Sequence, residues 1–186
     1  MRPVPTPSLP LGALDWNRAM NAGFLGAAAM TAVMLAARGL DLSGIDLELL
    51  LGSLVTSTLG FGPWFLGLGI HFMIGAGFGM VYAALMETFN KSGWRAGLAI
   101  ACVHVLAAGL ILPLIGAAHP LVRTGLLPSP GPFASGMGGA AVVLFVLLHL
   151  LYGVIVGACY GVVSPAAEEP DPNRAPRRPP TALRPG

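Results

Sequence analysis

Four long stretches without charged side chains run through the chain, separated by short polar connections. Asp, Glu, Lys and Arg are absent from residues 19–37, 49–86, 96–122 and 124–167. A helix needs about 20 mostly apolar residues to cross a bilayer. The pattern therefore predicts an all-α, polytopic membrane protein, a four-helix bundle. The expected spans are about 17–37, 63–86, 95–116 and 138–163.

Two of these stretches are longer than one helix needs. Residues 49–62 are too short to cross a membrane alone and contain several Ser, Thr and Gly residues, so we expect an interfacial or re-entrant piece, without choosing between them. Prolines at positions 128, 130 and 132 forbid a regular helix at the start of the last stretch, which therefore holds one span. We expect the first helix to be retained rather than cleaved, because four prolines precede it.

The composition agrees with this reading. Of 186 residues, ten are Lys or Arg and eight are Asp or Glu, and 55% are hydrophobic. Globular domains are about 45–50% apolar and about a quarter charged. These figures exclude a soluble enzyme, a nucleic-acid binder and a disulfide-stapled secreted domain. The expected partner is the lipid bilayer, with no nucleic acid.

The basic residues predict the orientation. With four spans, the N-terminal tail, the second connection and the C-terminal tail share one side and hold Arg2, Arg18, Lys91, Arg95, Arg174, Arg177, Arg178 and Arg184. The opposite side holds only Arg38 and Arg123. Because Lys and Arg accumulate on the cytoplasmic face, we expect both termini there, in a prokaryotic cytoplasmic (inner) membrane. We divide the chain into a disordered tail (1–15), the transmembrane domain (16–164) and a disordered Pro/Arg-rich tail (165–186).

A sequence pattern occurs twice. Residues 71–82 and 149–160 share His-x3-Gly-x3-Gly-x2-Tyr, the second copy 78 positions after the first. The pattern predicts a duplicated two-helix hairpin. Since each hairpin has an even number of spans, the copies would form a parallel repeat about an axis along the membrane normal.

The spacing places small residues on one helix face. At about 100° per residue, the glycines and the tyrosine of each copy lie within about 80° of its histidine. Helices in lipid associate where small residues let their backbones approach. The residues expected to pack helices together are Gly67, Gly75, Gly79, Tyr82, Gly153, Gly157 and Tyr160.

These features resemble an uncharacterised family of small prokaryotic four-helix membrane proteins. The resemblance covers about residues 19–163 and rests on Gly26-x4-Thr31-x2-Met34, Asp46-Leu-Glu-Leu-Leu-Leu-Gly52, both histidine stripes and Pro113-x2-Gly116. One departure is Ala27-Ala28, where the family pattern has Gly-Thr. The resemblance implies the topology and no activity or cofactor.

Three histidines fall within the predicted spans. They are His71, His104 and His149, and ionisable side chains within a membrane are candidates for function. Counting about 1.5 Å per residue places all three in one middle layer, where imidazoles can ligate haem b or a metal ion. The simpler interpretation is hydrogen bonding between helices, with no cofactor. We further expect His71 and His149 to have equivalent surroundings, and no Asp, Glu, Lys or Arg deep in the bundle.

Other candidate chemistry is sparse. Met30 and Met34, with Met73 and Met80 a helix away, suggest a copper path, although methionine more often fills core gaps. Cys102 and Cys159 form no metal motif. Known catalytic motifs are absent, so we expect no enzyme. The leading hypothesis is an accessory or structural subunit of a membrane complex, or a homo-oligomer. The alternatives are a haem- or metal-binding redox module on the histidine layer and a small channel or solute carrier.

Overall fold

The computed structural model describes residues 14–161 as an all-α bundle without strands in that range. Its four long apolar helices are α1 (Trp16–Gly39), α3 (Phe61–Thr88), α4 (Gly93–Ala118) and α6 (Gly139–Tyr160). Each is long and apolar enough to cross a membrane, which confirms the four predicted spans. The protein is therefore a multi-pass integral membrane protein. The two predicted disordered tails lie, except for residues 14 and 15, outside the described residues.

Three short elements connect the spans. They are α2 (Leu47–Thr56), α5 (Pro120–Arg123) and the irregular 3-10 segment η2 (Pro132–Met137). The Asp46 side chain starts α2 by accepting a hydrogen bond from the backbone N–H of Leu49, at 3.0 Å. The stretch 49–62, left open as interfacial or re-entrant, thus consists mostly of a short helix and a turn.

The fourth span ends earlier than the hydrophobic pattern predicts. Helix α6 stops at Tyr160 instead of residue 163, and Gly161 follows with φ of 84°. A glycine in this left-handed region ends a helix at little steric cost. By contrast, α4 continues through Pro113, as membrane helices do when neighbouring helices compensate for the missing hydrogen bond.

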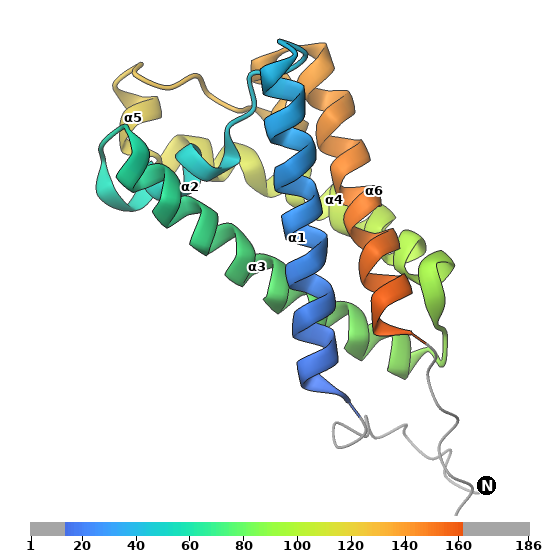
Figure 1. Cartoon of the computed structure of the whole chain (residues 1–186). Helices are drawn as coiled ribbons and strands as arrows, with labels where there is room; N and C mark the ends of the chain where they lie inside the picture. The colour runs from blue at the N-terminus through green and yellow to red at the C-terminus, as the bar shows by residue number, and fades with distance from the viewer. Residues whose placement is uncertain (1–13, 162–186) are drawn as a thin grey trace, which may run out of the picture.

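Helix α1 has a central place in the bundle. It packs against both α3 and α6, and α6 in turn packs against α4, while α3 and α4 contact each other far less. In Figure 1, α3 runs obliquely across α1, and α2 lies beside the first half of α3. The short helix is therefore part of the packed structure.

Glycines make the close contact between α1 and α3. A Cβ atom added to Gly23 would overlap the backbone of Gly75 and Gly79, and one added to Gly75 would overlap Ala27. Gly79 meets the carbonyl of Ala19 in the same way. This face leaves no volume for a larger side chain.

A second glycine contact joins α4 to α6. Here Gly153 lies against Gly97 and Ala101, and Gly157 lies against Gly97 and the carbonyl of Gly93. The contact therefore uses the glycines located 78 positions after Gly75 and Gly79. The two hairpins do not contact each other symmetrically, however. Helix α1 packs closely on α6, whereas α3 and α4, the corresponding pair in a parallel repeat, are separated by ring side chains. The parallel repeat stays a prediction.

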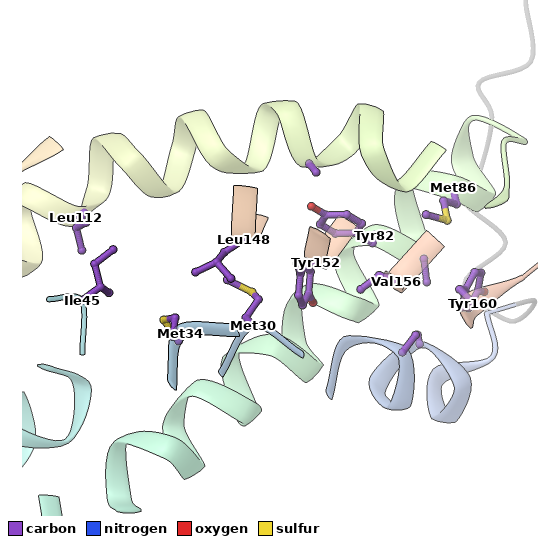
Figure 2. Close-up of a cluster of buried hydrophobic side chains, with 14 of the residues drawn as sticks. Met30, Met34, Ile45, Tyr82, Met86, Leu112, Leu148, Tyr152, Val156 and Tyr160 are labelled. Atoms are coloured by element: carbon purple, nitrogen blue, oxygen red, sulfur yellow. The ribbon is translucent and has the colours of Figure 1, made fainter. Parts of the chain in front are cut away.

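Two tyrosines lie at the centre of the buried cluster that Figure 2 shows. The Tyr152 ring covers Gly26 of α1, and its hydroxyl donates a hydrogen bond to the carbonyl of Gly75 in α3. The ring of Tyr82 meets the ring of Tyr152 edge to face, with centroids 5.4 Å apart. Tyr152 therefore connects α6 to both helices of the first hairpin.

Candidate functional site

A carboxylate inside the bundle is the most unusual feature of the structure. Glu48, in the first turn of α2, has none of its surface exposed. The expectation that no acidic side chain lies deep in the bundle is therefore wrong. Glu48 is buried because α2 packs closely on α3, where Gly52 and Gly67 allow the two backbones to touch. This approach carries Glu48 towards α1 and α3.

Glu48 belongs to a buried polar triad with Thr31 of α1 and His71 of α3. Thr31 Oγ1 lies 2.8 Å from Glu48 Oε1 and 3.1 Å from His71 Nδ1. The distance from His71 Nδ1 to Glu48 Oε1 is 3.6 Å. Three elements that are far apart in the sequence thus meet through polar atoms.

The hydrogen-bond directions in this triad follow from the donors available. The Thr31 hydroxyl has one hydrogen, and the ionised carboxylate of Glu48 can only accept, so Thr31 donates to Glu48. The contact from His71 Nδ1 to Thr31 Oγ1 must then use a hydrogen on Nδ1. Glu48 Oε2 has no hydrogen-bond partner among the described residues.

The pKa of Glu48 is shifted by opposing effects. Burial raises the pKa, whereas the adjacent His71 imidazole, the Thr31 hydroxyl and the Glu48 backbone N–H lower it, and the net shift is downward. The first turn of α2 adds the favourable end of a helix dipole. The carboxylate is therefore ionised at neutral pH.

A second polar contact fixes α2 from its other side. His119 is fully buried, and its Nδ1 accepts a hydrogen bond from the backbone N–H of Leu121 at 3.1 Å. Its Nε2 therefore carries the hydrogen and lies 3.0 Å from the Leu50 carbonyl and 3.2 Å from Ser53 Oγ. His119 thereby ties α2 to the start of α5.

The other two span histidines lie together in a different place. The rings of His104 and His149 meet edge to face, with centroids 5.0 Å apart. His104 Nδ1 lies 3.1 Å from the Tyr82 hydroxyl, and the His104 ring stacks on Phe78. His149 Nδ1 lies 2.8 Å from the carbonyl of Phe145.

The expected equivalence of His71 and His149 is therefore wrong. His71 contacts Thr31 and Glu48, whereas His149 contacts His104 and its own helix. Both occupy the same position of the repeated pattern, but only the first hairpin has a helix that brings a carboxylate to its histidine. The connections within the two hairpins differ, so the two histidines have different surroundings.

The histidine pair does not fit haem b. The His104 and His149 rings are in contact, so no porphyrin plane can lie between them. The cavity beside His149 has a volume of about 50 Å³, room for only a few water molecules. We therefore derive no chemistry through haem at these residues.

Sequence reasoning missed Glu48 and His119, the two fully buried ionisable residues of this region. Glu48 follows Asp41 and Asp46 between the first two predicted spans, and acidic side chains in such a connection are mostly exposed. A signal for His119 exists, since His-Pro directly after an apolar helix is typical of a residue that starts the next helix. The sequence contains no comparable signal for the burial of Glu48.

Comparisons with known proteins add no relative. No protein-family model matches the sequence, and neither a curated protein nor a solved structure matches it. The resemblance to an uncharacterised four-helix family therefore stays a prediction.

Proposed function

We propose that this integral membrane protein is a non-catalytic structural component, either an accessory subunit of a larger membrane complex or a homo-oligomer. The observation that carries the proposal is that buried polar side chains form hydrogen bonds between different helices and connections. Thr31 bonds Glu48, His119 bonds the α2 backbone, and Tyr152 bonds the carbonyl of Gly75. Each bond joins two elements, a use typical of interhelical stabilisation.

The interior supports this proposal over a channel or solute carrier. The cavity between α1, η2 and α6 has a volume of about 50 Å³ and is lined mainly by apolar side chains such as Leu112 and Leu148. Transport paths need polar lining and enough width for water or solute. A larger hollow of about 430 Å³ lies between the end of α1 and the start of α3, but its walls are also mainly apolar and include Leu35, Phe61 and Trp64.

One outer face of α3 is suited to contact with another membrane helix. Added Cβ atoms at Gly62, Gly69 and Gly77 would meet open space, so these glycines are not used inside the bundle. Met73 lies between the last two and is 70% exposed. Small residues facing lipid let a second helix approach closely.

We place the protein in a prokaryotic cytoplasmic membrane with both termini in the cytoplasm. The basic residues support this orientation, since eight of the ten lie in the two tails, in the connection between α3 and α4, or in the first turns of α1 and α4. The external side would then hold α2, α5 and η2.

Cysteine cross-linking in native membranes tests the structural role. In a chain with Cys102 and Cys159 replaced by Ser, single cysteines at Gly69 and Gly77 should give covalent adducts. A cysteine at Leu110, which is 65% exposed on α4, is the matched control and should stay uncross-linked. An adduct of twice the chain mass indicates a homo-oligomer, and another defined mass indicates a partner subunit. Monomers from all three variants would contradict the proposal.

A further inference from the structure

Three methionines and one histidine line a single buried cavity. Met30 and Met34 come from α1, Met137 from the end of η2 and His149 from α6. Met30 and Met34 are 6% and 2% exposed, and Figure 2 shows them one helical turn apart, with Met30 beside Leu148. The cavity volume is about 50 Å³. Residues separated by more than a hundred positions thus surround one small space.

The hydrogen bond of His149 leaves its other nitrogen free to bind a metal. Nδ1 lies 2.8 Å from the carbonyl of Phe145, and only a protonated nitrogen can donate to a carbonyl. In the neutral ring, Nε2 therefore keeps its lone pair. Histidines that bind metals are oriented in this way, with the second nitrogen donating to a backbone carbonyl or a carboxylate.

The ligand set selects a soft metal ion. Thioether sulfur prefers Cu(I), whereas Mg²⁺ and Ca²⁺ need oxygen ligands and Zn²⁺ is held by Cys, His and carboxylates. Within residues 14–161, no group of three or more His, Cys, Asp and Glu side chains is arranged to hold an ion. The methionines and His149 therefore suit a monovalent copper ion better than a divalent one.

The carboxylate nearest to the cavity is already paired. Asp46 lines the cavity, but its Oδ2 lies 2.7 Å from Arg38 Nη1 and its Oδ1 accepts the hydrogen bond from the Leu49 N–H. A neighbouring cavity of about 40 Å³ shares Asp46, Leu50 and Met137 with the first. Its other walls include Gly44 and Pro128, in the connections at the end of the bundle. Met137 thus borders both cavities.

We propose that Met30, Met34, Met137 and His149 form a binding site for one Cu(I) ion. The three thioethers and the imidazole Nε2 supply the ligands. The site is independent of the structural role proposed above. Met73 and Met80 are not among its ligands, which corrects the copper path suggested by the sequence, and Met73 faces outward.

Anaerobic titration of the purified full-length protein with Cu(I), against bicinchoninate as a competing chelator, tests the site. The wild type should retain one Cu(I) per chain. Met34→Leu and His149→Phe should weaken retention by at least about tenfold, as loss of metal-site residues does. Met73→Leu is the matched control and should leave retention unchanged. No retained copper, or equal loss in the control, would overturn the proposal.

X-ray absorption of the copper-loaded wild type does not depend on any variant folding. Sulfur and nitrogen scatterers around copper are expected. A shell of oxygen and nitrogen alone would overturn the site, because it would show that the methionines only fill the core. Met→Leu conserves volume, so thermal unfolding of Met34→Leu without copper should stay close to that of the wild type.

Discussion

Thr31 Oγ1 in α1 lies 2.8 Å from Oε1 of Glu48 in α2, and both side chains are buried. The bond joins a spanning helix to a helix of only ten residues that does not span. His71 lies against the same hydroxyl from α3, so the contact involves three elements. A connecting segment is thereby tied to two of the spans by buried polar contacts.

The glycine faces give the first prediction. Gly75→Leu and Gly153→Leu should each lower stability by about 1–3 kcal/mol or more, because the added side chain would collide with Ala27 or Ala101. Thermal unfolding in detergent is the measurement. Gly139→Leu is the control on α6, since open space surrounds that position and it lies outside the α3 face proposed for contact with another helix. Equal loss in all three variants would contradict the packing interpretation, because Leu is a better helix former than Gly and only a collision should lower the stability.

The second prediction concerns acid. Since the native pKa of Glu48 is lowered, its carboxylate stabilises the fold fully above the ordinary glutamate pKa of about 4.3. That stability is lost as the pH falls through the lowered native value. The free energy of unfolding should therefore drop on acidification, and part of the drop should be missing in Glu48→Gln.

Stability measurements between pH 7 and 3 check this, with Asp41→Asn, an exposed loop position, as the control. If the wild type instead became more stable in acid, the native carboxyl would be the protonated form.

How much the sequence predicts depends on the range of the contacts involved. The four spans follow from local composition, and the fold class with them. The position of Glu48 depends instead on Thr31 and His71, which lie 17 and 23 residues away in the sequence. Nothing near Glu48 indicates that two glycines will bring α2 onto α3.

The histidine layer shows the same limit. Residue spacing places His71, His104 and His149 at similar depths, but depth does not determine which rings meet. The pairing of His104 with His149 depends on how α4 and α6 are rotated, which their glycine contact sets. The repeat therefore predicted equivalent surroundings for His71 and His149, whereas the packing of α4 on α6 places His149 against His104.

The third prediction is the orientation in the membrane. With Cys102 and Cys159 replaced by Ser, a cysteine at Thr124 should react with a membrane-impermeant maleimide added to spheroplasts. A cysteine at Asn90 should react only after the membrane is broken. Both positions are exposed, so accessibility within the protein does not differ. The opposite labelling pattern would place the termini outside and contradict the assignment from Lys and Arg.

A double-mutant cycle between Thr31 and Glu48 tests most directly whether the buried triad holds α2 in the bundle. Thr31→Val, Glu48→Gln and the double variant would be unfolded in detergent at neutral pH, and the coupling free energy taken from the cycle. Residues in one hydrogen-bond network typically couple by about 0.5–3 kcal/mol. We predict a favourable coupling of at least about 1 kcal/mol, within that range. Effects that simply add, within about 0.5 kcal/mol, would contradict the account.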